Sequence, residues 1–574
     1  MNTAQPTIVR RPMTEERDLH PNPIVNRVFN ARGVQTGDPE DHRLHDLFQP
    51  TDLGGLDKAC EIIADAVRSQ RQITVIGDYD TDGATSTTLA ITALQACGSQ
   101  CVDFLIPNRF DMGYGLSEPL VDIAAKGGSK LLLTVDNGVS SLAGVAHAKQ
   151  LGLDVVVTDH HLPGDQLPIA DAIVNPNLVG DQFPSKNLAG VAVIFYVMNA
   201  VCKYLDEQLW FKKNNIPKPN PAEWLDLVAL GTVADLVPLD RNNRILVEQG
   251  LRRMRAGRAR PGINALLNIG KRRIETVVAS DLGFAVAPRL NAAGRLDDMQ
   301  RGVECLQATD STTAHALASE LDALNLARRE IESDMQSTAL EAVAKLQSTL
   351  DGNVPPVLCL FEHDWHQGVC GIIAGRLKER YHRPALVFAS ADDGSLRGSA
   401  RSIPGLHMRD IMASIDTEAP GLIDKFGGHA MAAGLSLSEQ ALPQFREAML
   451  RAVSAHFERH PPSRILQTDG PLEAEHMNLE LAKLLRFAAP WGMGFAEPCF
   501  DGEFVVQYER VVGERHLKMT LAPLEAPEFS FDAIAFGQAE KCGMRRCRAV
   551  YRLDINHWRG RDNLQLMIDH LEAR

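Results

Sequence analysis

The sequence predicts an α/β protein in which a parallel-sheet domain is joined by a long helix to a smaller α/β domain, followed by a small β-barrel. Between Gln72 and Pro176, short β-branched runs alternate with segments of helical periodicity, which is typical of βαβ units. The stretch from Ser311 to Leu350 holds no Gly and no Pro, which predicts a long helix. After Pro461 and Pro462 the pattern changes to strands with little helix between them, which favours a barrel.

The first domain is predicted from its strands and the helices between them. Apolar residues dominate each strand, as expected for strands buried on both faces of a parallel sheet. The predicted strands are Ile73 to Ile76, Val102 to Ile106, Leu131 to Val135, Val155 to Thr158 and Ala172 to Val174. The predicted helices between them are Thr85 to Ala96, Ser117 to Ala125 and Leu142 to Leu151.

The long helix is predicted to separate two lobes. Its 40 residues, from Ser311 to Leu350, would span about 60 Å at 1.5 Å per residue, which is longer than one domain is wide. The alternative is two helices broken near Asn325. A second α/β segment follows, with predicted strands at Val357 to Leu360 and Ala385 to Phe388.

The last part of the chain is predicted to be antiparallel. Its strands are Phe500 to Val512, His516 to Leu521, Ala533 to Phe536 and Ala549 to Ile555. We therefore expect five parts: an N-terminal extension (1–50), a catalytic domain (51–310), the connecting helix (311–350), the second α/β domain (351–460) and the barrel (461–574).

The composition is that of an ordinary globular protein, with 45% hydrophobic and 23% charged residues, which excludes a disordered chain. The 59 Lys and Arg against 73 Asp and Glu give a net charge of −14, which by itself argues against a nucleic-acid partner. Ten cysteines without a CxxC spacing predict buried, reduced thiols. The most apolar segment, Leu188 to Cys202, is too short to span a membrane and is expected to be a core helix. We expect a cytoplasmic protein without a secretory signal.

Acidic and histidine residues follow the predicted strands. Asp78, Asp80 and Asp82 come after the first strand, Asp136 ends the third, and Asp159 to His161 end the fourth. Because ligand sites form at the carboxyl ends of parallel strands, these side chains should share one crevice. Such a density of carboxylates requires a cation. Asp and His ligands without thiolate favour Mg²⁺ or Mn²⁺, and shared carboxylates favour two ions about 4 Å apart.

Each of these residues taken singly has a plainer explanation. An Asp after a strand is often a helix N-cap, which applies to Asp82 or Asp136, and a lone histidine pair is more often structural. The coincidence of three clusters at strand ends favours the metal site.

Seven motifs together resemble the DHH phosphoesterase superfamily. The first four are typical of the superfamily, and the last three resemble its bacterial members that degrade single-stranded DNA from the 5′ end and carry a DHHA1 domain. The motifs are VIGDYDTDGATST (75–87), TVDNG (134–138), TDHH (158–161), GTVADLVPL (231–239), PNR (107–109), APRLNAAGRLDD (287–298) and FGGHAMAAG (426–434).

The resemblance implies a set of metal ligands. Asp80 and Asp136 would hold one ion, and Asp136 would bridge to a second ion held also by Asp82, His160 and Asp235. Some members have a metal-binding His where this chain has Ile76, so that Asp78 or water would complete the first ion's shell.

Other residues are expected to act on the substrate. By the same resemblance, His161 would contact the scissile phosphate and Asp159 would orient the histidine pair. Arg289, Asn291 and Arg295 could clamp phosphate oxygens; the alternative is an ion pair of an Arg with Asp297 or Asp298.

The resemblance also implies a pocket for the terminal 5′-phosphate. Arg109, Ser399 and Arg401 would line it, with the last two on one face of an extended segment. Gly427, Gly428 and His429 would offer backbone N–H groups and an imidazole to phosphate; the alternative is a plain glycine turn.

Two basic segments are candidates for contact with the strand. Eight basic residues and no acidic one lie between Leu251 and Arg273, a run that is usually a solvated face. Lys541 to Arg561 mixes cations with aromatic rings, as an OB-fold does when it binds single strands. The candidate strand contacts there are Arg548, Tyr551, Arg552, Trp558 and Arg559.

The expected function is an exodeoxyribonuclease that hydrolyses single-stranded DNA from the 5′ end by two-metal-ion catalysis, releases 5′-mononucleotides, and acts in recombination and repair. The alternatives are a superfamily member acting on short RNA or small phosphate substrates, and a non-catalytic nucleic-acid scaffold. Expected partners, from the resemblance, are single-stranded DNA, single-stranded-DNA-binding protein and a RecQ-type helicase, with the chain a monomer. Two bound ions would change the formal charge to −14 + 4 = −10, leaving a confined basic path for DNA.

Overall fold

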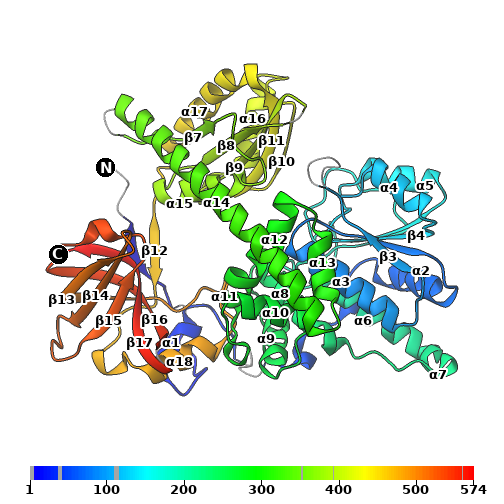
Figure 1. Ribbon diagram of the computed structural model, residues 1–574, viewed down its shortest axis with the longest axis horizontal. Helices are drawn as coiled ribbons and strands as arrows, with labels where there is room; N and C mark the ends of the chain where they lie inside the picture. Colours follow the sequence, from blue (N-terminus) through cyan, green and yellow to red (C-terminus); the bar gives the residue numbers. More distant parts are fainter. Residues whose placement is uncertain are drawn as a thin grey trace. The chain divides into compact units, whose positions relative to one another are not determined.

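The computed structural model describes residues 6–13, 15–36, 42–108, 115–350, 353–391, 393–558 and 560–574 (Figure 1). The chain divides into two compact units. One unit comprises Arg10–Ala323 and Thr468–Arg574, and the other comprises Leu324–Gln467 together with the residues up to Val9. Two segments far apart in the sequence therefore share the first unit.

The larger unit contains the predicted parallel sheet. Its strands are β2 (Ile73–Ile76), β3 (Val102–Leu105), β4 (Leu131–Val135), β5 (Asp154–Thr158) and β6 (Ala172–Val174). All neighbours are parallel, in the order β3-β2-β4-β5-β6. Because β2, β4 and β5 are adjacent, their carboxyl ends lie side by side. The predicted fold class is confirmed for this domain.

Helices cover both faces of this sheet. Figure 1 shows α4 and α5 on one side of the sheet and α2, α3 and α6 on the other. Helix α3 begins at Thr81 rather than at the predicted Thr85, because Asp80 caps its first turn. The apolar segment from Leu188 becomes a core helix, as predicted. The bounds are α2 (Leu56–Arg68), α3 (Thr81–Ala96), α4 (Glu118–Lys126), α5 (Leu142–Gln150) and α6 (Gly190–Glu207).

A helical layer completes this part of the unit. It includes a π-helical turn, η5 (Leu282–Val286), which precedes α12. The helices are α1 (Pro23–Asn30), α7 (Trp210–Asn214), α8 (Leu225–Ala234), α9 (Arg241–Arg255), α10 (Pro261–Ile269), α11 (Ala279–Asp281), α12 (Ala287–Leu296) and α13 (Gln300–Gln307).

The long helix is continuous. Helix α14 runs over Ser311–Thr349, so the alternative of two helices broken near Asn325 is wrong. Asn325 is buried, and its side-chain oxygen accepts a hydrogen bond of 3.0 Å from Arg328 one turn later. The side-chain oxygen is therefore satisfied within the helix, and the buried residue does not interrupt it.

The smaller unit contains a mixed five-stranded sheet in the order β10-β11-β9-β8-β7. Only β7 and β8 are parallel to each other, and the other neighbours are antiparallel. Phe388 and Phe445 pack edge to face in its core. The elements are β7 (Leu358–Phe361), α15 (Cys370–Tyr381), β8 (Ala385–Ser390), β9 (Ser395–Arg401), α16 (Met408–Glu418), β10 (Lys425–Gly428), β11 (Ala432–Ser438) and α17 (Leu442–Arg459).

The C-terminal strands close into a barrel in the order β13-β14-β15-β17-β16. The expectation of antiparallel strands is wrong at one place, because β15 pairs with β17 in parallel. A closed barrel with an odd number of strands requires at least one parallel pair. The elements are β13 (Phe500–Val512), β14 (His516–Pro523), β15 (Phe531–Ala535), β16 (Arg546–Trp558) and β17 (Arg561–Ala573), preceded by α18 (Leu479–Ala488) and by β12 (Ile465–Thr468), which pairs with β1 (Thr7–Arg10).

All ten cysteines are free thiols, and most are buried, as the sequence predicts. Cys542 is the exposed exception. Among the described residues, none of the helices combines the length and the apolar character that a membrane crossing needs.

Candidate metal centre

The predicted ligands meet at the carboxyl edge of the parallel sheet. Three groups of side chains each place their ligand atoms within 4.8 Å of one another. Asp136 belongs to two of the groups, as a bridging carboxylate would. The groups are Asp78 with Asp80 and Asp136, Asp82 with His160 and Asp235, and Asp136 with His160 and His161.

Two of the aspartates are fixed by helix N-termini. Asp80 caps α3 by accepting a hydrogen bond of 3.0 Å from the Gly83 amide. Asp82 is 1% exposed and accepts from the amides of Gly190 (2.7 Å) and Val191 (3.0 Å) at the start of α6. The N-cap alternative for Asp82 therefore applies to Asp80 instead. Capping occupies one oxygen of Asp80, so the same carboxylate can also bind a cation.

Asp136 adopts a rare backbone conformation. Its φ is +62°, in the left-handed region that non-glycine residues seldom occupy. Its Oδ1 lies 3.1 Å from His160 Nε2, which in turn lies 3.5 Å from Asp235 Oδ2. A Cβ on Gly190 would lie only 2.5 Å from Asp136 Oδ1. The space for the Asp136 carboxylate thus depends on a glycine that the sequence did not single out.

Asp159 orients one histidine of the pair. Its Oδ1 lies 2.7 Å from His161 Nδ1 and accepts from the backbone amides of His160 (2.8 Å) and His161 (3.1 Å), while its Oδ2 accepts from Val139 (2.9 Å). Asp159 therefore holds the ring of His161, whereas it contacts His160 only through the backbone.

The charge on His161 follows from this contact. Burial opposes a charged imidazole, but the hydrogen bond and charge of Asp159 outweigh it and raise the pKa of His161 to about 9. The same interaction lowers the pKa of Asp159 despite its burial. His161 is therefore a cation at neutral pH, which suits a residue that contacts a phosphate.

The other carboxylates repel one another. Burial, and then the charge of Asp80, raise the pKa of Asp82 to about 7. Burial and neighbouring carboxylates raise the pKa of Asp136 and of Asp235 well above the usual range. A divalent cation reverses this cost because it favours the ionised form of every ligand. The donor set, all oxygen and imidazole, fits Mg²⁺ or Mn²⁺.

The loop that carries Asp235 is supported from far along the chain. The Leu239 amide donates a hydrogen bond of 2.7 Å to the Met493 carbonyl. The Arg244 guanidinium lies 4.3 Å from the centre of the Phe495 ring and donates to the Leu239 carbonyl at 3.1 Å. A Cβ on Gly492 would lie 2.7 Å from Leu239. Residues 491–495, which we call the clamp loop, thus pack closely on the chain that follows Asp235.

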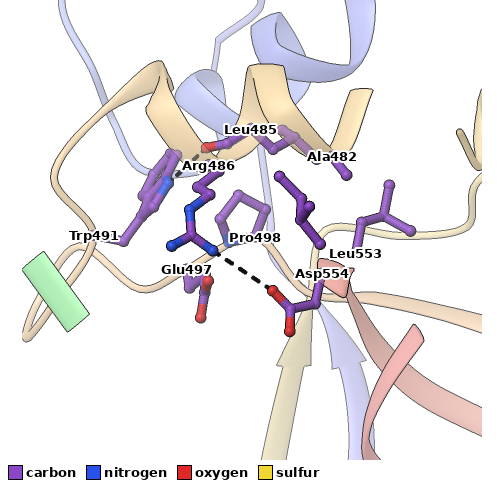
Figure 2. A pocket seen from close by; sticks show the side chains of 9 residues that line it. Ala482, Leu485, Arg486, Trp491, Glu497, Pro498, Leu553 and Asp554 are labelled. Atoms are coloured by element: carbon purple, nitrogen blue, oxygen red, sulfur yellow. Dashed lines mark hydrogen bonds and ion pairs between the residues drawn. The ribbon is translucent and has the colours of Figure 1, made fainter. Parts of the chain in front are cut away.

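The clamp loop is itself anchored beside the barrel. Trp491 Nε1 donates to the Leu485 carbonyl at the end of α18 (2.8 Å), and Arg486 lies 3.8 Å from Asp554 of β16. Figure 2 shows these side chains around a small pocket that Pro498 also lines. No sequence motif marked this support, because it depends on contacts between distant segments.

Two of the three side chains predicted to clamp phosphate, those of Arg289 and Asn291, already bond to other residues of the protein. Arg289 Nε lies 2.8 Å from Asp322 Oδ1, so the ion-pair alternative holds for Arg289, with a partner other than Asp297 or Asp298. The Asn291 side-chain oxygen accepts hydrogen bonds of 2.8 Å from both the amide and the hydroxyl of Thr81. Asn291 therefore positions the loop between Asp80 and Asp82. Arg295 lies in the last turn of the same helix, α12.

The predicted 5′-phosphate residues belong to both units. Arg109 lies outside the described residues. Ser399 and Arg401 lie on one face of β9, as predicted, since alternate residues of a strand share a face. Both flank Gly371 in the first turn of α15, where a Cβ would lie 2.9 Å from Arg401 Nη2 and 3.6 Å from Ser399 Oγ.

The glycine pair is not in a loop. Gly427 and Gly428 belong to β10 and pair with β11, and the His429 amide donates to the Ala432 carbonyl (2.8 Å). The expectation of a backbone N–H at His429 for phosphate is therefore wrong. Gly428 has φ +136°, and a Cβ there would lie 2.5 Å from the Ala432 carbonyl, so tight hairpin geometry explains this glycine.

The candidate strand contacts in the barrel need correction. Tyr551 is 1% exposed and packs against Phe500 and Phe504, so it offers no ring to a base. Tyr551 lies on the same face of β16 as the buried Cys547 and Ala549, so the ordinary alternation of the strand turns its side chain inward. Arg548 pairs with Asp501 (2.8 Å), and Arg552 pairs with Asp569 (2.9 Å) and Glu497. Arg559 and the side chain of Trp558 lie outside the described part of the chain.

Four of the eight basic residues in the run 252–273 form ion pairs of 3.2 Å or less with carboxylates outside the run. Arg252 and Arg255 both bond Glu248, at 2.9 and 3.1 Å. Arg260 pairs with Asp226 (3.2 Å) and Arg272 with Asp281 (3.2 Å). This outcome agrees with the plainer expectation of a solvated, ion-paired face.

The fold and the site define a class of protein. Residues 72–232 match the DHH family, N-terminal domain, and residues 354–455 match the DHHA1 domain. The parallel sheet with its Asp and His cluster lies in the first match, and the mixed five-stranded sheet in the second. The protein is therefore a phosphoesterase of the DHH/DHHA1 class.

Longer comparisons identify the family. Residues 468–570 match the RecJ OB domain. The single-stranded-DNA-specific exonuclease RecJ of Salmonella typhimurium is 51% identical over 96% of this chain and 96% of its own length, and that of Bacillus subtilis is 34% identical over 97% of this chain and 68% of its own. The chain belongs to the RecJ family of single-stranded-DNA-specific exonucleases.

Solved structures agree with this assignment. The crystal structure of RecJ in complex with Mn²⁺ from Thermus thermophilus has a TM-score of 0.79 and 28% identity, covering 96% of this chain and 76% of that one. A second structure, exonuclease RecJ bound to manganese, has a TM-score of 0.58 and 31% identity, covering 72% of this chain and 97% of that one. Both hold the metal that the Asp and His cluster of this chain fits.

The close approach at Gly190 yields a first prediction. Gly190→Ala would place a methyl group against Asp136 and displace the amide that binds Asp82, so we expect Mn²⁺ affinity to fall and nuclease activity to drop by about 100-fold. Isothermal calorimetry and initial rates measure the two effects. Gly375→Ala, in helix α15 where a Cβ meets nothing within 4 Å, is the matched control. Wild-type affinity in Gly190→Ala would contradict this account.

The raised carboxylate pKa values yield a second prediction. In the metal-free protein the pKa of Asp82 is about 7, so binding of Mn²⁺ must release its proton. Because the pKa values of Asp136 and Asp235 are raised as well, affinity should rise by at least about tenfold per pH unit below pH 7. A raised folded-state pKa also means that the metal-free protein loses stability as pH rises towards 7.

The increase in melting temperature on adding Mn²⁺ should therefore be larger at pH 8 than at pH 6. Calorimetry and thermal unfolding across this range check both statements. A pH-independent affinity would show that these carboxylates are already ionised without metal.

Proposed function

We propose that the chain hydrolyses single-stranded DNA from its 5′ end, releasing 5′-mononucleotides in recombination and repair. The chain is a metal-dependent nuclease of a family of single-strand-specific exonucleases. The observation that carries the proposal is that Asp136 groups with Asp78 and Asp80 on one side and with His160 on the other. His160 also groups with Asp82 and Asp235, an arrangement suited to two divalent ions. The relatives that match the full length favour this activity over a small-phosphate enzyme or a non-catalytic scaffold.

Bound divalent ions supply an acidified water and neutralise charge that develops on the phosphoryl oxygens. Asp80 and Asp136 would hold one ion, with Asp78 completing its shell because Ile76 is buried in the core and has no ligand atom. Asp82, His160 and Asp235 would hold the second ion together with Asp136.

The side chains of this protein contribute in two ways: they orient the metal ligands, and they place a positive charge, on His161, where the phosphate would bind. Asp159 fixes the His161 ring through Nδ1 and keeps the imidazole protonated, so that Nε2–H can donate to a phosphate oxygen. Asn291 holds the Thr81 backbone and hydroxyl, which fixes the spacing of Asp80 and Asp82. The electrostatic stabilisation is therefore built before the substrate arrives.

We propose that Ser399 and Arg401 bind the terminal 5′-phosphate and so set the 5′ polarity, with Arg109, which lies outside the described residues, as a further proposed ligand. The placement of Ser399 and Arg401 supports this pocket because their side chains share one face of β9 and converge beside the N-terminal turn of α15. An arginine fork and a hydroxyl are suitable donors for a phosphate dianion.

The remaining assignments are also proposals. We take residues 51–310 as the catalytic domain, 311–350 as the connecting helix, 351–460 as the DHHA1 domain and 461–574 as the strand-binding barrel. We place the protein in the cytoplasm as a monomer, since ten free thiols suit a reducing compartment. Single-stranded-DNA-binding protein and a RecQ-type helicase are the proposed partners.

The activity is tested by digestion of 5′-labelled single- and double-stranded DNA with and without Mn²⁺. We expect immediate release of labelled mononucleotide from the single strand with Mn²⁺, and negligible release from the duplex or in EDTA. Asp136→Asn, which removes the shared ligand, should be inactive under the same conditions. Cleavage that ignores strandedness, or that proceeds without a divalent ion, would overturn the proposal.

The polarity pocket is tested by Arg401→Ala. Loss of a charged hydrogen bond to the terminal phosphate should reduce the preference for 5′-phosphate over 5′-hydroxyl ends by about 10- to 100-fold. Mn²⁺ affinity should stay at the wild-type value. The ratio of kcat/KM on the two substrates measures the effect, and Arg397→Ala, on the same face of β9, is the matched control. An unchanged ratio would remove Arg401 from the pocket.

A further inference from the structure

Five arginines surround the loop Asp469–Pro471 at the edge of the barrel. Two follow one another at the end of β1, two come from α1 and the residues just after it, and one lies on β16. We call this set the arginine cluster; Figure 1 shows α1 beside the barrel. Its members are Arg10, Arg11, Arg27, Arg32 and Arg548.

Two members of the cluster are fully paired. Arg32, with a side chain 2% exposed, forms a bidentate ion pair with Asp469 at 2.8 and 3.0 Å. Arg548 bonds Asp501 at 2.8 Å, and Asp501 also accepts from the Thr468 hydroxyl at 2.6 Å. Both carboxylates are therefore largely satisfied by these two partners.

The other three members hold a surplus of positive charge. Arg10 Nε lies 3.5 Å from Asp501 and Arg11 Nε 3.7 Å from Asp469, both longer than a charged hydrogen bond. Arg27 donates to the Pro471 carbonyl at 2.9 Å. Five guanidinium groups and these two carboxylates leave 5 − 2 = 3 formal positive charges. Burial is the main cause that lowers the pKa of Arg11 and of Arg27, and one neighbouring guanidinium adds to it in each case, Arg32 for Arg11 and Arg10 for Arg27.

The side chains of Arg10 and Arg27 come together over the backbone of Gly470. Gly470 has φ +84°, and from the point where its Cβ would stand, Arg10 Nε and Arg27 Nη1 are each 4.0 Å away. The Arg10 side chain is 60% exposed, so its guanidinium group is open to solvent, whereas Gly470 itself is buried. The Phe500 ring lies 6.0 Å from the Arg27 guanidinium and restricts its movement. The result is a preformed pair of donors above a residue without a side chain.

We propose that Arg10 and Arg27 bind a backbone phosphate of the single-stranded DNA that the barrel holds. The inference rests on the proposed function, and it gives the N-terminal segment a part in binding the substrate. A chain with a net charge of −14 can hold a polyanion only where local charge is positive, and this cluster supplies such a place on the barrel. The fork of an arginine matches a phosphate with two parallel donors.

The test compares salt dependence in the full-length, metal-loaded protein. The variants are Arg10→Gln/Arg27→Gln, the charge-conserving Arg10→Lys/Arg27→Lys, and the control Lys58→Gln/Arg68→Gln, which removes the same charge from α2. The substrate is 5′-phosphorylated oligothymidylate of about 60 nucleotides, long enough to span several OB-fold sites. The readouts are kcat, KM and the slope of log(kcat/KM) against log[KCl], together with the thermal unfolding midpoint.

For the glutamine pair we expect KM to rise on the order of tenfold and the slope to become shallower by about 0.7 to 1.4, as for one or two lost phosphate contacts on a single strand. The lysine pair should keep most of the slope, and the α2 control should match wild type. Wild-type slope and KM in a folded glutamine pair would overturn the inference while leaving the proposed function intact. A wild type inactive on this substrate would instead contradict the proposed function.

A competition experiment distinguishes DNA from an acidic protein segment as the ligand of the arginine cluster. Poly-glutamate peptide is added to wild type and to the glutamine pair at fixed KCl. We expect it to inhibit both alike. Inhibition that is strong for wild type and lost in the glutamine pair, with an unchanged salt slope on DNA, would assign the cluster to an acidic peptide and overturn the proposal.

Discussion

The repulsion between buried carboxylates is the constraint on which the catalytic half of this molecule depends. Asp78, Asp82 and Asp136 are each at most 4% exposed and lie among further acidic groups. In water-poor surroundings such groups are stable together only with a cation or with aimed positive dipoles. The fold supplies the dipoles at the starts of α3 and α6, and the imidazolium of His161 adds a fixed positive charge. Metal binding supplies the rest, which couples the stability of this sheet edge to its chemistry.

The features that could be predicted from the sequence are those that depend on a pattern of neighbouring residues. Strand runs such as Leu131–Val135 and the aspartates at their ends are visible because strand period and burial act over a few residues. The long helix was equally visible from its lack of Gly and Pro. The glycines beside Asp136 and Asp82, and the clamp loop at Leu239, were not, because their importance arises from close contact between segments that are distant in the chain.

The number of charged residues in a stretch of sequence does not predict the net charge of the surface that the stretch forms. The run of residues 252–273 has no acidic member, yet Glu248, Asp226 and Asp281 form ion pairs with four of its arginines. Tyr551 was expected to offer its ring to the DNA strand, but it lies on the buried face of β16 with Cys547 and Ala549. In contrast, the arginines near the N-terminus, which no pattern marked, keep an excess over their carboxylates. The net charge of a surface depends on the ion pairs that its residues form, and the partners in those pairs can come from distant parts of the sequence.

The clamp loop has a consequence for the order of synthesis. The hydrogen bond from Leu239 to Met493 joins the loop after Asp235 to a residue that a ribosome adds late in a chain of 574 residues. A nascent chain that ends before this point can form the parallel sheet but lacks the contact that steadies its last metal ligand. We therefore expect the metal centre to reach full activity only after the segment that leads into the barrel has been synthesised. Full nuclease activity would then develop only when most of the chain, up to the proposed strand-binding barrel, has been synthesised.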